Sequence, residues 1–202
     1  MVGKTNSKTK AAPKKAAIKT KTTTTTKTKT VTKSKPEVKP ISTWRKIVTM
    51  AICVVIPVVV GLLSSALTGE AMSKFGDFSK PPLAPPSWLF PVAWTLLYIA
   101  MGVASYFIIM KPARTKQEKF ERKVCIVIYL AQLAFNFVWS PLFFLAGEYF
   151  FALMWLIAMW IMIVVLMFWA RKRSMAAVWL LLPYALWCLF AMYLNAGIML
   201  LN

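Results

Sequence analysis

The sequence contains no histidine among its 202 residues, and it has only three cysteines and six acidic residues. Without histidine, imidazole is excluded as an acid–base catalyst, a metal ligand or an axial ligand of haem. The three cysteines have no metal-ligand spacing, and within apolar runs a thiol behaves as a small hydrophobic side chain. There is no glycine-rich phosphate loop, and no apolar run contains a pair of carboxylates. We therefore expect no catalytic residues for hydrolysis or phosphoryl transfer, no metal site and no resident cofactor.

Hydrophobic residues make up 59% of the sequence, and the mean hydropathy is +0.62. That is too apolar for a soluble domain of average composition. The formal net charge is nevertheless +19, and fourteen of the 25 Lys and Arg residues lie in residues 1–46. The charge and the apolar residues therefore occupy different parts of the chain, which divides into residues 1–43 and residues 44–202.

Residues 1–43 contain the run KTKTTTTTKTKTVTKSK and almost no side chains that could form a core. Low hydrophobicity with high net charge predicts a disordered basic tail. The tail is either simply solvated or held by anionic lipid headgroups, which are a closer partner than nucleic acid because an apolar helix follows at once. We expect no nucleic-acid partner.

Five apolar runs follow, at residues 47–68, 91–110, 124–145, 149–170 and 175–200. Each is long enough, at 1.5 Å per residue, to cross a hydrocarbon layer of roughly 30 Å. The predicted fold is therefore an all-α integral membrane protein, a bundle of five transmembrane helices. Five spans put the tail, the loop 111–123 and Arg171–Arg173 on one side, and this concentration of positive charge agrees with the positive-inside rule.

The loop before the second run contains Pro81, Pro82, Pro85 and Pro86. Each proline fixes its own φ and disfavours helical geometry in the preceding residue. We therefore expect a stiff, extended cap at the membrane surface, followed directly by the second helix.

Polar and aromatic side chains recur at helical spacing inside two runs. Gln132, Asn136 and Trp139 share one face of the third helix, and the fifth helix has Tyr184, Trp187, Ala191 and Asn195 on one face. A buried amide in hydrocarbon needs a partner, either in another helix or in a ligand. Two interpretations follow: ordinary contacts between helices, or a pocket for a large, flat, mostly apolar ligand.

Three stretches, PPLAPPSWLFPVAWTLLYIAMGVASY, NFVWSPLFF and LLPYALWCLFAMYLN, resemble the signature motifs of the translocator protein family, also called the tryptophan-rich sensory protein family. The resemblance covers residues 44–202 and implies a five-helix bundle, often a homodimer, with a pocket near the first loop. It implies binding of porphyrin and haem, of sterols and of synthetic benzodiazepine-site ligands. Matched motif by motif, it assigns ligand-binding roles to Trp94, Asn136, Trp139, Trp187, Ala191, the cap residues Leu83, Ala84 and Trp88, and the first-helix residues Gly61 and Ser64.

The chain departs from the family pattern at two places. A Trp–Tyr pair that usually lies in the first loop is replaced by Lys74 and Phe75, and the sterol motif at the end of the fifth helix is replaced by Ala196 and Leu200. The expected function is a membrane receptor or carrier for tetrapyrroles in porphyrin homeostasis or stress response. The alternatives are a light- and oxygen-dependent porphyrin-degrading enzyme and a non-catalytic scaffold. The resemblance and the tail lead us to expect the outer mitochondrial membrane or the endoplasmic reticulum and Golgi of a eukaryote.

Overall fold

The computed structural model describes residues 42–73 and 76–202, so the predicted basic tail lies outside the described residues, apart from Ser42 and Thr43. The described elements are α1 (Thr43–Ser73), α2 (Leu89–Met110), α3 (Lys116–Ser140), the π-helix η2 (Pro141–Leu145), α4 (Tyr149–Arg173) and α5 (Met175–Leu201). All five α-helices are long and apolar enough to span a membrane, and the described part of the chain forms no strand. The predicted five-helix membrane fold is confirmed.

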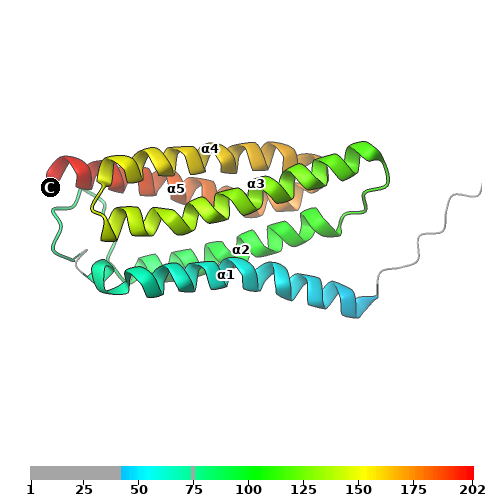
Figure 1. The fold of residues 1–202 in the computed structure, drawn as a ribbon, viewed down its shortest axis with the longest axis horizontal. Coiled ribbons are helices and arrows are strands. Elements are labelled where there is room, and N and C mark those ends of the chain that lie inside the picture. Colours follow the sequence, from blue (N-terminus) through cyan, green and yellow to red (C-terminus); the bar gives the residue numbers. More distant parts are fainter. Residues whose placement is uncertain (1–41, 74–75) are drawn as a thin grey trace, which may run out of the picture. The chain divides into compact units, whose positions relative to one another are not determined.

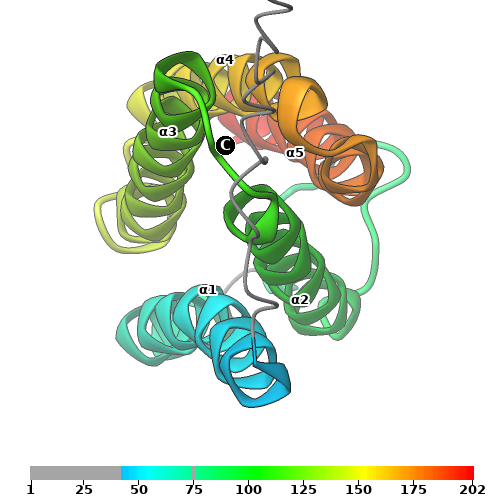
Figure 2. The same ribbon diagram turned by 90° about the vertical axis from the view of Figure 1, so that its right-hand side faces the viewer.

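The helices follow one another around the bundle in the order α1, α2, α5, α4, α3, since each packs against the next and α1 also meets α3 and η2 (Figure 2). The α1–α2 loop, the α3–α4 turn and the end of α5 lie together at one end, as Figure 1 shows. The start of α1, the α2–α3 loop and the α4–α5 junction lie at the other end. This is the arrangement of loops that five spans require.

Basic residues gather at the second of these ends. The described part of this end has Glu118 and Glu121 as its acidic residues against a much larger basic set: Arg45, Lys46, Lys111, Arg114, Lys116, Lys119, Arg122, Lys123, Arg171, Lys172 and Arg173. At the opposite end of the bundle, where the α1–α2 loop lies, the described charged residues are one basic residue, Lys80, and three acidic residues, Glu70, Asp77 and Glu148. The charge asymmetry expected from the sequence is therefore present within the described bundle itself.

Some helices extend beyond the apolar runs, because polar residues outside the runs are helical too; the start of α3 is the clearest case. At the start of α3, the Thr115 hydroxyl accepts from the Glu118 N–H at 3.1 Å, and Glu118 Oε2 accepts from the Thr115 N–H at 2.9 Å. This reciprocal capping box satisfies two backbone groups that helix geometry leaves unpaired. The helix α3 therefore begins two turns before the apolar run that starts at residue 124.

Prolines inside helices free carbonyl groups, and neighbouring helices approach them. Pro57 in α1 has no N–H, so the Cys53 carbonyl four residues earlier lacks its helical donor. Gly102 of α2 lies directly against it: a Cβ at Gly102 would be 2.6 Å from both Cys53 O and Val54 Cα. Glycine at residue 102 thus lets the α1 and α2 backbones touch.

Pro141 has the same effect at the end of α3. It leaves the Phe137 carbonyl without its helical donor, and Ser64 of α1 donates to that carbonyl at 3.5 Å. The chain then continues as η2, in which the Ala146 N–H bonds to Pro141 O at 3.0 Å, before Gly147 turns it with φ +65°. The contact between α1 and α3 therefore includes a hydrogen bond to a backbone carbonyl that has no helical donor because Pro141 lacks an N–H.

The proline-rich loop is not extended along its whole length, because it contains a turn at residues 81–84. The Ala84 N–H bonds to Pro81 O at 3.3 Å, and Leu83 has φ 66°, a conformation that non-glycine residues rarely adopt. The prolines fix their own φ but not that of Leu83, so the prediction of an extended cap was wrong at this point.

The loop is fastened to the end of α5 instead of spreading over the bundle. Tyr193 donates its hydroxyl to Pro82 O at 2.6 Å, and the Asn202 side chain pairs with both backbone groups of Ser79 at 3.0 Å. Pro81 is buried against Gly197, where a Cβ would be 2.5 Å from the proline ring.

Replacing Gly197 with alanine should therefore detach the loop while leaving the helices intact. The new methyl group overlaps the Pro81 ring, which is rigid, so the loop has to move away from α5. We expect hydrogen exchange at the amides of Ser79 and Ala84 to become several-fold faster. Gly76→Ala is the matched control, because nothing lies within 4 Å of a Cβ there. Equal exchange rates in the two variants would contradict the fastening.

Candidate ligand-binding site

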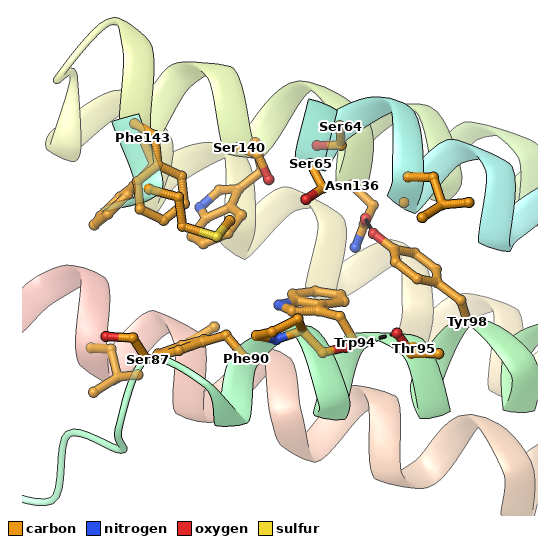
Figure 3. Close-up of a pocket in the computed structure, with 18 of the residues that line it drawn as sticks. Ser64, Ser65, Ser87, Phe90, Trp94, Thr95, Tyr98, Asn136, Ser140 and Phe143 are labelled. Carbon is orange, nitrogen blue, oxygen red and sulfur yellow. Dashed lines mark hydrogen bonds between the residues drawn. The ribbon is translucent and has the colours of Figure 1, made fainter. Parts of the chain in front are cut away.

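A cavity of about 220 Å³ lies between α1, α2, α3 with η2, and α5 (Figure 3). Its wall is uncharged, and most of its side chains are apolar or aromatic. The lining residues are Val58, Gly61, Leu62, Ser64, Ser65 and Met72 of α1; Ser87, Phe90, Pro91, Trp94, Thr95 and Tyr98 in and before α2; Asn136, Trp139 and Ser140 of α3; Phe143 and Phe144 of η2; and Ala191, Leu194, Asn195 and Ile198 of α5.

Trp94 forms the aromatic centre of this wall. Its ring stacks on Tyr98 one turn later, with 5.6 Å between centroids, and meets Tyr184 of α5 edge-on at 6.3 Å. Figure 3 shows the Trp94 ring reaching into the space between α2 and the opposite helices. A second stacked pair, Trp139 and Phe143, lines the cavity from α3 and η2 with 5.4 Å between centroids. Flat apolar surfaces therefore face the cavity from two sides.

A chain of polar side chains runs from this wall into the core. The Tyr98 hydroxyl donates to Asn136 Oδ1 at 2.5 Å, Asn136 Nδ2 donates to the Tyr184 hydroxyl at 3.3 Å, and that hydroxyl donates to Gln132 Oε1 at 2.8 Å. All four side chains are buried. In an apolar medium such a chain is stable only because its members satisfy one another. It fixes Asn136 and Tyr98 at the cavity wall, on two different helices.

The structure brings six of the ten sequence-predicted site residues to the cavity: Gly61, Ser64, Trp94, Asn136, Trp139 and Ala191. Gly61 is needed for the fit, because a Cβ there would overlap the Tyr98 ring. The assignment of these residues to ligand binding remains a prediction, but their convergence from four helices is a property of the fold.

The other four predicted residues do not line the cavity. Trp187 packs edge-on against Phe90, with 6.2 Å between centroids, and Phe90 itself lines the cavity, so Trp187 lies behind the wall. The cap residues Leu83 and Trp88 are 85% and 65% exposed, and Ala84 is half-buried in the loop. The loop is fastened to α5 at Ser79 and Pro82, and these three residues are not among those that line the cavity.

Tyr98 and Phe90 are lining residues that the sequence reading passed over. Both were detectable, because each is four residues from Trp94 and therefore shares its face of α2. Thr95 was harder to find, since a lone hydroxyl on a membrane helix usually bonds its own backbone. Thr95 does so, donating to Pro91 O at 2.7 Å.

The chemistry available at this wall is that of neutral hydrogen bonds and aromatic surfaces. Within residues 42–73 and 76–202 no group of three His, Cys, Asp or Glu is placed to hold a metal ion. These features define a multi-pass membrane protein with an aromatic, uncharged internal cavity.

Comparison with known proteins identifies the family. The sequence profile of the TspO/MBR family matches residues 53–201, and the chain belongs to this family. It is 36% identical over 159 residues to the tryptophan-rich protein TspO of Chlorobaculum tepidum, covering 78% of this chain and 98% of that protein. The translocator protein of Ovis aries is 35% identical over 129 residues, covering 64% and 75%. The tryptophan-rich sensory protein of Cereibacter sphaeroides is 33% identical over 140 residues, covering 68% and 84%. The resemblance carried by the three motifs is confirmed.

Proposed function

We propose that the protein is a membrane receptor or carrier that binds flat, largely apolar ligands in this cavity, with tetrapyrroles such as protoporphyrin and haem as the first candidates. The observation that carries the proposal is the Trp94 indole, held by Tyr98 and Tyr184 and turned toward an uncharged cavity. A conjugated macrocycle stacks well on such a surface. Asn136 supplies a polar contact on the wall opposite.

The uncharged wall also sets the orientation of a porphyrin. Burying an ionised carboxylate without a partner is costly, and no lining side chain is cationic. The macrocycle should therefore lie against Trp94, with its propionates directed out of the cavity toward water or headgroups. This orientation requires no change in the buried polar chain.

The names of these relatives, translocator protein and tryptophan-rich sensory protein, describe carriers or receptors rather than enzymes, and they support this choice. A light- and oxygen-dependent porphyrin-degrading activity, expected to use Trp94 and Trp187, is less well supported because Trp187 lies behind Phe90. The proposal includes a homodimer, a role in porphyrin homeostasis or stress response, and residence in the outer mitochondrial membrane or the endoplasmic reticulum and Golgi. Sterols remain a secondary ligand class.

Replacing Trp94 with phenylalanine should weaken binding of protoporphyrin IX about three- to tenfold, because one aromatic contact is worth about 0.5–1.5 kcal/mol beyond its area. Ala191→Thr should weaken binding comparably by adding bulk to the wall of α5. Affinity is measured from the shift of the porphyrin absorption band in a titration of the purified protein in nanodiscs.

Trp179→Phe is the matched control. Trp179 is 65% exposed and lies near the start of α5, at the end of the bundle away from the cavity. Its replacement should leave porphyrin affinity unchanged. If it weakens binding as much as Trp94→Phe does, the porphyrin site is not this cavity.

A further inference from the structure

Aromatic and basic side chains lie together on the outer surface of α3 and α4, at the basic end of the bundle (Figure 1). Phe120 of α3 is 54% exposed and meets Trp169 of α4 edge-on, with 6.0 Å between ring centroids. The Lys172 ammonium lies 4.4 Å from the centroid of the Trp169 ring. The Arg171 guanidinium carbon lies 4.3 Å from the centroid of the exposed Phe168 ring. Two exposed cations are therefore held over aromatic rings at the surface of α4.

Two more lysines flank Phe120 on α3. Lys116 lies four residues before it and Lys123 three residues after it, so both are its neighbours on the helix surface, and both are exposed. The acidic residues of these turns have other partners: Glu118 accepts from two backbone N–H groups at the start of α3, and Glu121 accepts from a glutamine amide at 3.2 Å. We call the whole set the α3–α4 cluster: Lys116, Phe120, Lys123, Phe168, Trp169, Arg171 and Lys172.

The α3–α4 cluster lies at the border of the hydrocarbon layer. The apolar run of α3 starts at residue 124 and that of α4 ends at residue 170, so the rings are within a turn of the border and the cations lie at it or just outside. Aromatic rings are common at this level of a membrane, and lysine can lay its aliphatic stem on apolar surface while its ammonium stays in water. The phosphate of a phospholipid occupies the same level.

We infer that the α3–α4 cluster binds the headgroup of an anionic phospholipid. The cations of the cluster surround the phosphate, and the acyl chains extend over Phe120 and over Val127 and Leu130, which are 55% and 50% exposed further along α3. Basic residues attract anionic headgroups within about a Debye length. This site is on the outside of the bundle and is independent of the cavity.

The same contacts favour an anionic headgroup over a zwitterionic one. Phosphatidylcholine and phosphatidylglycerol share a phosphodiester, but the first also brings a quaternary ammonium close to the cations of the cluster. An indole ring can attract such an ammonium, yet the Trp169 ring already carries Lys172. Phosphatidylglycerol brings no positive charge, and it is therefore the probe that the cluster should prefer.

The test compares two tryptophans at the same depth. Trp169 and Trp179 each lie five residues from Ser174, on opposite sides of the α4–α5 junction, and α5 itself contains no charged residue. The full chain is reconstituted in phosphatidylcholine bilayers that contain a minor fraction of dibrominated phosphatidylglycerol or dibrominated phosphatidylcholine. Bromine quenches the fluorescence of a tryptophan that the lipid contacts. Subtracting the emission of Trp169→Phe or Trp179→Phe from that of the wild type isolates each tryptophan.

Trp169 should prefer phosphatidylglycerol to phosphatidylcholine about fivefold, the effect of one basic residue beside an anionic headgroup. Trp179 should show a much smaller preference. Lys172→Gln should lower the preference at Trp169 to the value at Trp179. Lys46→Gln is the matched control, because it removes the same charge at the same end, from α1, which has no contact with α4 in the described bundle. It should leave the preference at Trp169 unchanged.

Equal preferences at the two tryptophans would overturn the inference. So would an effect of Lys46→Gln as large as that of Lys172→Gln, because the general positive field of this end would then explain the preference. Inorganic phosphate, added at constant ionic strength, should leave the quenching unchanged; if it displaces phosphatidylglycerol, the cluster takes free phosphate and the lipid assignment is wrong. If Trp169→Phe does not fold, native mass spectrometry replaces the quenching: equal retention of phosphatidylglycerol by the wild type and Lys172→Gln would overturn the site.

Discussion

Gly102→Ala is expected to destabilise the protein by roughly 3 kcal/mol or more, at or beyond the upper end of the usual cost of overpacking a core. The added methyl carbon would lie 2.6 Å from Cys53 O and 2.6 Å from Val54 Cα. Both are backbone atoms of α1, so no side-chain rotation relieves the overlap, and α1 has to move away from α2. The loss should appear as a large fall in the thermal unfolding temperature of the detergent-solubilised protein.

The matched control is Gly69→Ala in α1. Nothing lies within 4 Å of a Cβ at this helical position, and alanine favours a helix over glycine by about 0.5–1 kcal/mol. This variant should be as stable as the wild type or slightly more so. Similar unfolding temperatures for Gly102→Ala and Gly69→Ala would mean that α1 and α2 do not touch at residue 102.

The second large effect is expected at Arg173, the last residue of α4. Its side chain is 2% exposed, and its guanidinium donates to the carbonyls of Ile108, Lys111 and Pro112 at the end of α2. The last carbonyls of a helix have no partner within it, and a cation there also interacts favourably with the helix dipole. In return, Lys111 Nζ donates to Lys172 O at 2.9 Å. The ends of α2 and α4 thus cap each other.

Arg173→Gln should therefore cost about 2–3 kcal/mol, because hydrogen bonds to charged groups are strong and the shorter amide cannot reach three carbonyls. The unfolding midpoint in a denaturing detergent reports this loss. Arg171→Gln is the control: Arg171 is exposed and lies 4.3 Å from the Phe168 ring centroid, a contact worth about 0.5–1 kcal/mol at such a site. A larger effect at Arg171 than at Arg173 would refute the capping role.

Five apolar runs sufficed to predict the five spans, because the length of an apolar run is set by the thickness of the hydrocarbon layer. The same runs could not locate the helix ends. The first two turns of α3 contain five charged residues, and they are helical because the box of Thr115 and Glu118 starts them, not because they enter lipid. Hydropathy indicates which residues lie in the hydrocarbon layer, whereas capping interactions decide where a helix begins.

The sequence predicts a lining residue correctly where the position of the residue on its own helix is enough to show which way the side chain faces. Asn136 and Ala191 lie on faces that helical spacing identifies, and Trp94 was assigned by the resemblance to the family; all three line the cavity. Trp187 has a similar angular position on α5 but is shielded by Phe90 of α2, and no pattern within α5 reveals what another helix places in front of it. The loop was harder still, because its course depends on the positive φ of Leu83 and on Gly197, far away in sequence.

The hydrogen bonds of the buried chain from Tyr98 to Gln132 can run in either direction. Each member is a hydroxyl or an amide, so each can donate and accept. Turning the two amides over and rotating the two hydroxyls preserves the number of bonds: Gln132 then donates to Tyr184, Tyr184 to Asn136, and Asn136 to Tyr98. In the described state the Tyr98 proton is committed to Asn136, and the hydroxyl can only accept from a ligand. In the reversed state that proton is free to point into the cavity. In the proposed ligand site, Tyr98 can thus present either an acceptor or a donor to the cavity without any movement of a helix.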